Sequence, residues 1–165
     1  MTDLGLLKQF LGLEIKQYES DIMIRKHTYD SKLLLRLNMD EFNSSNFPFL
    51  STIKLGEIGD FPLVDCSLYR QLVQSLLYLT HTRTDLEYDI SAVEIYIHQK
   101  NDIHWNEANR ILQYVQATRN FGVHFVASSP LELVGFYDLD CVGDPNERNS
   151  TSVFVLMFFS GPIYC

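Results

Sequence analysis

The spacing of apolar residues along the chain predicts strands at both ends and helices between them. Near the N-terminus, "FLGLEIKQ" alternates apolar and polar positions, with Leu11, Leu13 and Ile15 expected on one face. The segment "IMIRK" follows it after the polar segment "YESD". Strict alternation is typical of a half-buried strand, so the two segments predict a β-hairpin. Tyr29, Leu33 and Leu37 then recur every four positions. This period predicts a short amphipathic helix that ends near Asn38.

A linker and three more helices are expected in the middle of the chain. Residues 40–64 contain Ser, Asn, Gly and two prolines without a clear period, which is typical of a connection. Asp65 or Ser67 is expected to cap the next helix, Asp85 the one after it, and a third helix begins near Asp102. The apolar positions expected to face the core are Leu68, Leu72, Leu76, Leu79, Leu86, Ile90, Val93, Ile97, Trp105, Ala108, Leu112 and Val115.

The last part of the chain carries three strand-like segments, "GVHFVA", "LELVGFY" and "TSVFVLMFF". The third has apolar side chains on both faces, and such a strand requires cover on both faces. Without that cover, residues 151–165 are expected to be poorly protected or to self-associate. The whole pattern predicts an α+β fold with a β-hairpin and helix, then a helical segment, then a three-stranded sheet.

Composition narrows the class of protein. The 165 residues fit one domain or slightly more, and a hydrophobic fraction of 46% is enough to bury a core. The net charge is −8, with 13 basic and 21 acidic residues, so strong nucleic-acid binding is not expected of the chain as a whole. Cys66, Cys141 and Cys165 lack the spacing of a disulfide framework or a zinc site. We therefore expect a soluble protein of a reducing intracellular compartment, without a membrane span.

The segment "VGFYDLDCVGD" places two carboxylates two positions apart at the end of an apolar run. If this run is a strand, Asp138 and Asp140 project from the same face, because side chains alternate with period two. Two carboxylates so close together repel each other unless water or a cation surrounds them. The residues alone leave two interpretations open. One is that the two carboxylates belong to a metal site, and the other is that they form an acidic strand end.

Five ordered segments resemble the part of a copia-type retrotransposon Pol polyprotein that follows the polymerase active site. They are "MTDLGLLKQFLGLEI", "YDSKLLLRLNM", "LYRQLVQSLLYLTHTRTDL", "HWNEANRILQYVQATRNFGVHF" and "VGFYDLDCVGDPNERNSTSVFVL". The family usually has Gly at the position of Gln74, Pro at Thr84, Trp at Cys141 and Lys at Asn149. The parent protein of this family is an RNA-directed DNA polymerase, or reverse transcriptase, with an attached ribonuclease H.

The resemblance implies a division of the chain. Residues 1–39 correspond to the C-terminal part of the reverse transcriptase, with a hairpin that grips the primer and the helix after it. Residues 40–64 are the linker, and residues 65–120 form a helical connection. Residues 121–165 then correspond to the truncated, three-stranded start of a ribonuclease H-like sheet.

The resemblance also implies a role for Asp138. The first Asp of the family's ribonuclease H motif is a ligand of Mg²⁺ or Mn²⁺, and it falls at this position. The other acidic ligands of the family belong to later elements, so Asp138 is expected to be a vestigial ligand. The polymerase signature is an adjacent Asp–Asp pair, and no two Asp residues adjoin anywhere in the sequence. A catalytically inactive, pseudogene-like piece of Pol, without a cofactor of its own, is therefore expected.

Two other functions remain open. A residual nucleic-acid-binding module would hold an RNA–DNA or primer–template duplex in a groove lined by Arg70, Arg83, Arg110 and Arg119. The family commonly carries Lys or Arg at the positions of Asn109, Gln113 and Gln116, so this binding is expected to be weak or absent. His98, His104 and Trp105 would suit base stacking, but Trp105 is more typical of a core anchor. An interaction with an intact polymerase through an exposed strand edge is the other alternative.

Overall fold

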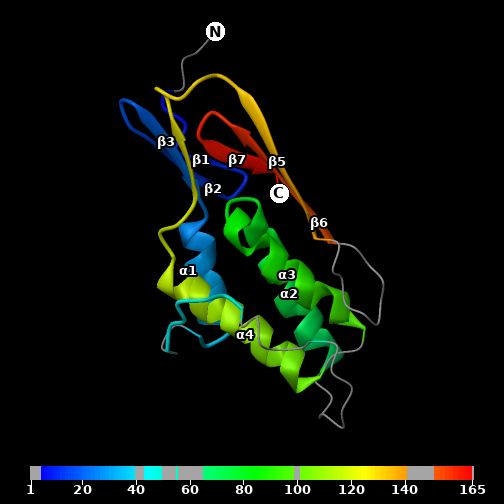
Figure 1. The fold of residues 1–165 in the computed structure, drawn as a ribbon. Helices are drawn as coiled ribbons and strands as arrows, with labels where there is room; N and C mark the ends of the chain where they lie inside the picture. The colour runs from blue at the N-terminus through cyan, green and yellow to red at the C-terminus, as the bar shows by residue number, and fades with distance from the viewer. Residues whose placement is uncertain are drawn as a thin grey trace.

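The computed structural model describes residues 5–39, 43–49, 55, 65–98, 101–140 and 151–164 (Figure 1). The described part is α+β, as the sequence predicted, with two small antiparallel sheets. In chain order, the strands and helices are β1 (Gln9–Phe10), β2 (Leu13–Gln17), β3 (Asp21–Arg25), α1 (His27–Arg36), α2 (Cys66–Thr80), η1 (Thr84–Leu86), α3 (Glu87–Glu94), η2 (Ile95–Ile97), α4 (Asp102–Ala117), β4 (Val123–Val126), β5 (Leu133–Asp140), β6 (Thr151–Phe158) and β7 (Gly161–Tyr164).

The first sheet contains the predicted hairpin. Its strand order is β1-β2-β3-β4, and Ile15 of β2 lies opposite Ile24 of β3. The prediction was wrong for Leu11, which we expected on the same face as Leu13 and Ile15. Leu11 lies instead in the turn between β1 and β2, with φ of 47°, followed by Gly12 with φ of 82°, and its side chain is 79% exposed.

Strand β4 belongs to the first sheet. We grouped residues 123–126 with the C-terminal strands, and this grouping was wrong, because β4 pairs with β3. Val123 lies opposite Ile24 and is buried. Gly122 permits this pairing, since a Cβ atom at that position would lie 2.3 Å from the Ile24 carbonyl oxygen. The local pattern identified the strand, but it carried no information about the partner.

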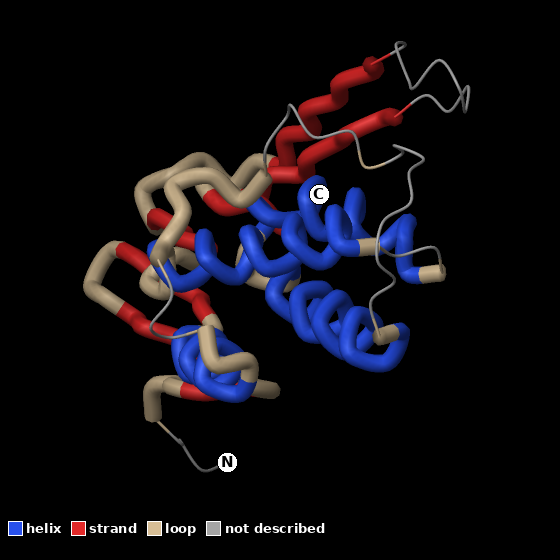
Figure 2. The backbone as a smooth tube through the Cα atoms, turned by 90° about the horizontal axis from the view of Figure 1, so that it is seen from below, coloured by secondary structure: helices blue, strands red, loops and turns tan. Residues whose placement is uncertain are grey.

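The second sheet has the order β5-β6-β7. Strand β7 was not predicted, because "GPIY" begins with Gly and contains Pro, which is tolerated only at the edge of a sheet. Both edges of β6 are paired, so its backbone is not an exposed edge. The faces of the sheet remain partly open, since Phe136 and Tyr137 on opposite faces of β5 are 61% and 65% exposed. Figure 2 shows β5 and β6 projecting beyond the helices.

The four α-helices pack around one apolar core. Most buried residues come from the predicted stripes, with Leu72, Leu76 and Leu79 of α2 all at 1% exposure or less. The core also contains residues that were not predicted, which are Leu34, Met39, Tyr69, Val73 and Ile111. Trp105 packs partly buried against this core, which supports its expected role as an anchor. Leu68 was predicted on the same face, but its side chain is 54% exposed, because the buried face of α2 runs through Tyr69 and Val73 rather than through Leu68.

One of the two predicted helix caps is confirmed. The Asp65 side chain accepts hydrogen bonds from the backbone N–H groups of Ser67 and Leu68 at the start of α2. The end of α1 near Asn38 is also confirmed, with Asn38 at φ of 53°. The expected cap at Asp85 was wrong, since this residue lies inside η1 and binds an arginine instead. Within the described residues, no helix has both the length and the apolar character to cross a membrane.

Candidate functional site

The predicted metal ligand Asp138 lies in β5, opposite Val153 of β6. The expected strand is therefore present. The side chains of residues 138–140 lie outside the described part, as do Asp144 and Glu147. Within the described residues, no group of three His, Cys, Asp or Glu side chains is placed to hold a metal ion. The ligand role of Asp138 stays a prediction.

The four predicted groove arginines occupy different environments. Arg70 is exposed on α2. Arg110 lies on α4 with its Nε atom 3.6 Å from a carboxylate oxygen of Glu107. Arg83 is buried in the turn after α2, and Arg119 is half-buried just after α4. The structure brings Arg83 and Arg119 to one region, since both influence the buried carboxyl group of Asp30.

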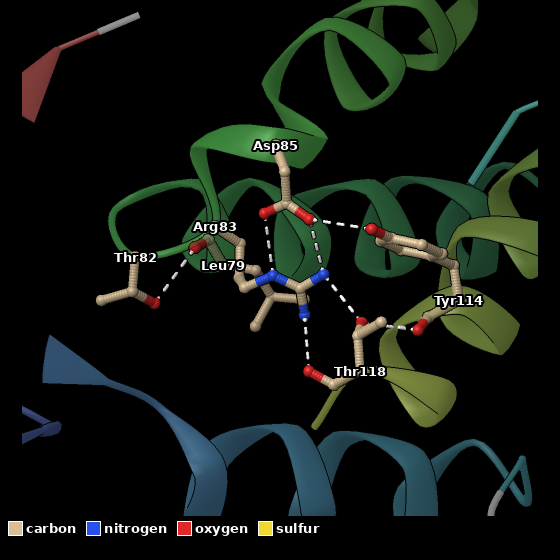
Figure 3. Close-up of polar contacts among 6 residues, drawn as sticks. All are labelled: Leu79, Thr82, Arg83, Asp85, Tyr114 and Thr118. Atoms are coloured by element: carbon tan, nitrogen blue, oxygen red, sulfur yellow. Dashed lines mark hydrogen bonds and ion pairs between the residues drawn. The ribbon is translucent and has the colours of Figure 1, made fainter. Parts of the chain in front are cut away.

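Arg83 is the centre of a buried polar cluster (Figure 3). Its side chain is 2% exposed and forms a two-point contact with the Asp85 carboxylate, at 2.9 Å from Nε and 2.8 Å from Nη2. Nη1 donates to the Thr118 carbonyl oxygen at 3.3 Å, and Nη2 donates to the Thr118 hydroxyl at 2.8 Å. Because Thr118 is the C-cap of α4, the guanidinium satisfies an end carbonyl of that helix.

Two aromatic rings flank the same guanidinium. Its Cζ atom lies 5.4 Å from the ring centre of Tyr114 and 5.5 Å from that of Phe121. The Tyr114 hydroxyl also donates to Asp85, at 3.3 Å. The polar and aromatic contacts all lie within the protein, and they connect the turn after α2 to the end of α4. The burial of Arg83 therefore disfavours the template-groove role predicted for it.

Lys26 and Asp30 form a second buried cluster, which the sequence interpretation missed. The Lys26 side chain is 2% exposed, donates to the Tyr78 carbonyl oxygen and lies 3.5 Å from the centre of the Tyr78 ring. Burial lowers the pKa of Lys26 to about 8. Burial also raises the pKa of Asp30 to about 6, against the opposing influence of Arg83, Lys26 and Arg119. Asp30 lies on the buried face of α1 with Leu33 and Leu34, so a carboxylate within an apolar stripe was the available signal.

Tyr78 connects the hairpin to the helices. Its hydroxyl donates to the Leu11 carbonyl oxygen at 3.2 Å, and its ring lies edge-on to Tyr29 at 4.6 Å. A Cβ atom on Gly12 would lie 2.6 Å from the Tyr78 hydroxyl oxygen, so the turn between β1 and β2 approaches closely. This arrangement orients the hairpin on α2 and supplies no nucleophile or metal ligand set.

His104 has a structural role as well. Its Nδ1 atom accepts a hydrogen bond from the Asn101 backbone N–H, while the Asn101 side chain caps α4 in return. With Nδ1 accepting, Nε2 carries the proton and donates to the Leu55 carbonyl oxygen at 3.0 Å. Burial lowers the pKa of His104, which favours this neutral form. The buried position disfavours the alternative in which His104 stacks on a nucleic-acid base.

Replacing Asp89 with Asn should stabilise the protein at neutral pH. Burial, followed by the carboxylates of Asp85 and Glu107, raises the pKa of Asp89 to about 6. Because this folded-state pKa lies above the ordinary value of 3.8, the protonated form is favoured in the fold. Its contribution to stability is complete below pH 4 and is lost as the pH rises through 6. We expect Asp89→Asn to raise the free energy of unfolding at pH 7 by about 1–2 kcal/mol.

Urea unfolding at pH 7 and at pH 4 measures this effect, and the gain should disappear at pH 4. The control is Glu94→Gln, which changes an exposed acid on the same helix and should alter stability by less than about 0.5 kcal/mol at either pH. An equal gain from Asp89→Asn at both pH values would contradict the assigned cause.

The buried clusters around Arg83 and Lys26 have a structural role. The described residues form an α+β packing unit in which the buried charges hold helices and a hairpin together. They supply no complete set of metal ligands.

The comparisons with known proteins found curated relatives that the chain resembles along most of its length. The chain is 32% identical to the Retrovirus-related Pol polyprotein from transposon RE2 of Arabidopsis thaliana, over 95% of the chain and 11% of that polyprotein. It is 30% identical to the corresponding RE1 polyprotein of the same plant, with the same coverage. It is 27% identical to the Pol polyprotein from transposon TNT 1-94 of Nicotiana tabacum, over 99% of the chain and 13% of that protein.

The chain is a homologue of copia/Ty-like retrotransposon Pol polyproteins, and the resemblance inferred from the five segments is confirmed. It spans about a tenth of the length of these relatives. No protein-family model matches the chain, and no solved structure matches it significantly.

Proposed function

We propose that the chain is a non-catalytic connecting unit of a Pol polyprotein, placed between an RNA-directed DNA polymerase and a ribonuclease H. One observation supports this proposal. A segment of the Pol relatives matches 95% of the chain, yet the sequence contains no adjacent Asp–Asp pair. The polymerase reaction needs carboxylates that hold two metal ions. The buried clusters around Arg83 and Lys26 fit a unit that fixes the relative positions of its neighbours.

The division of the chain is part of the proposal. Residues 1–39 would be the end of the reverse transcriptase, and residues 65–120 the helical connection. Because β4 pairs with the hairpin, we place the start of the ribonuclease H-like part at β5 rather than at residue 121. An antiparallel β5-β6-β7 sheet with Asp138 on its first strand supports this assignment.

The described residues do not form a site for the metal ions of the parent enzyme. Mg²⁺ takes oxygen ligands, and a two-metal centre needs several carboxylates around it. The described side chains contain no such group, and the side chain of Asp138 lies outside them. We therefore propose Asp138 as a single vestigial ligand and assign no cofactor to the described part of the chain.

Binding of a primer–template duplex is proposed to be weak. The net charge is −8, Arg83 is buried, and Arg110 is paired with Glu107. A basic groove that neutralises several phosphates would need these side chains to be free.

A second candidate function is association with an intact polymerase. It is favoured by β5, which pairs with β6 on one side and, among the described strands, with none on the other. Leu133, Phe136 and Tyr137 of this edge strand are all more than 60% exposed. An exposed apolar edge strand can add a strand from another chain.

Primer extension tests the proposal directly. The purified chain should not extend a primer on an RNA template in the presence of Mg²⁺ or Mn²⁺, because it lacks the carboxylate pair. Product above a heat-treated control that disappears on addition of a chelator would overturn the assignment as non-catalytic.

A binding measurement in the same buffer separates the connecting unit from the nucleic-acid-binding alternative. Fluorescence anisotropy with an RNA–DNA duplex at physiological salt should give a dissociation constant no tighter than about 10⁻⁴–10⁻⁶ M, the non-specific range. A nanomolar constant that weakens in Arg110→Ala and Arg119→Ala variants would favour the binding module instead.

A further inference from the structure

A hollow lies where the two sheets meet, away from the clusters described above. Its volume is about 470 Å³, and three parts of the chain line it. These are residues 17–22 around the turn between β2 and β3, residues 125–127 at the end of β4, and Phe159 in the turn between β6 and β7. The volume is within the range of small-ligand sites.

Hydrogen bonds hold the walls of this hollow in place. The Ala127 backbone N–H donates to the Ser20 carbonyl oxygen at 2.7 Å, which ties β4 to the β2–β3 turn. The Val126 N–H donates to the Ser160 hydroxyl at 2.7 Å, and this hydroxyl donates to the His124 carbonyl oxygen at 3.3 Å. Each wall is thus attached to β4, and these hydrogen bonds fix the walls relative to one another.

Two of the aromatic side chains in the hollow are fixed by close packing or unusual backbone geometry. Gly161 packs against the Phe125 ring so closely that a Cβ atom would lie 2.7 Å from Phe125 Cε1. Phe159 has φ of 53°, a conformation that is exceptional for a bulky residue, and its ring contacts Phe158 edge-on at 4.7 Å. Strained backbone of this kind is concentrated at functional sites.

The chemistry of the lining favours a cation on an apolar stem. Tyr18, Phe125 and Phe159 provide aromatic surface, and Glu19 and Asp21 provide carboxylates beside it. Tyr18 is 58% exposed, so its ring is open to a ligand. Aromatic faces attract cations, and carboxylates at the same place add charge complementarity while they repel phosphate.

We propose that this hollow binds an arginine side chain presented by a partner protein. A planar guanidinium can stack flat on an aromatic ring while it forms a two-point contact with a carboxylate, whereas a lysine ammonium has neither the flat face nor the paired donors. Asp21 lies 3.4 Å from His124 Nε2, so one of its oxygen atoms already faces a nitrogen donor of the protein. Glu19 at the tip of the turn is the carboxylate assigned to the incoming arginine. This inference does not depend on the proposed function in the Pol polyprotein.

An NMR titration of the ¹⁵N-labelled full chain tests the proposal. The probe is the blocked tripeptide glycyl-arginyl-glycine, and the matched control has citrulline, which keeps the shape of arginine without its charge. The arginine peptide should shift the amide signals of residues 18–22 and 125–127 and bind at least tenfold more tightly than the citrulline peptide. Equal binding of the two peptides, or shifts confined to other residues, would overturn the proposal.

Two surface variants and two further ligands sharpen this test. Tyr18→Ala should weaken binding of the arginine peptide at least fivefold, whereas Tyr88→Ala, which removes an equally exposed tyrosine from α3, should leave it unchanged. A lysine peptide should bind more weakly than the arginine peptide. Equal binding of the lysine peptide, the same shifts from an RNA oligonucleotide, or an unchanged affinity in Tyr18→Ala would each contradict the assigned ligand.

Discussion

Replacing Arg83 with methionine is expected to lower the free energy of unfolding by about 2–3 kcal/mol, because the hydrogen bonds of the buried guanidinium to Asp85 and Thr118 are lost. Methionine keeps an unbranched apolar stem but removes every N–H donor. The Thr118 carbonyl oxygen at the end of α4 and the Asp85 carboxylate then lose their partner. Urea unfolding followed by circular dichroism measures the loss as a lower midpoint with an unchanged slope.

Arg70→Met is the matched control for this substitution. Arg70 lies on the exposed side of α2, so its replacement should change stability by no more than about 0.5 kcal/mol. If Arg83→Met cost less than 1 kcal/mol, the cluster of Figure 3 would not hold the turn after α2 to α4 in solution.

The other large effect is expected at Leu76, which is fully buried in α2. Leu76→Ala should cost about 2–5 kcal/mol, because it removes buried methyl groups and leaves a cavity between the helices. Leu68→Ala is the control, since its side chain is 54% exposed in the same helix and should cost less than about 1 kcal/mol. Chemical unfolding of both variants compares them, and equal losses would show that the Leu68 side chain is packed in solution.

These two leucines also show how far periodicity predicts the fold. The period of four identified α2 correctly and placed Leu72, Leu76 and Leu79 on its buried face. It could not show that the buried face reaches the first turn at Tyr69 rather than at Leu68, because that depends on the position of α3, where the Val93 carbonyl oxygen accepts a hydrogen bond from Tyr69. Strand β4 illustrates the same limit, since alternation predicts a strand while the choice of β3 as its partner depends on distant residues.

The charge of a side chain likewise did not predict its burial at the candidate site. The sequence identified Arg83 as a basic residue of interest, but a basic residue is usually exposed, and the carboxylate that permits its burial was interpreted as a helix cap. Asp85 is only two positions away, so an arginine close to an acid at a helix end was the available signal. The buried pair of Lys26 and Asp30 depends on Tyr78 from another helix, which no local pattern reveals.

The pairing of β4 with β3 has a consequence for the order of folding. Ile24 and Val123 lie opposite each other although about 100 positions separate them in the chain. Closing a loop of this length costs roughly 4 kcal/mol of chain entropy, and the contacts that compensate for it form only when the strands meet. The helices α1, α2, α3 and α4 lie within this loop, and their formation shortens the effective distance between the strands. We therefore expect β4 to join the first sheet late, after the helical core has collapsed. Mutations in β4 should then accelerate unfolding more than they slow folding.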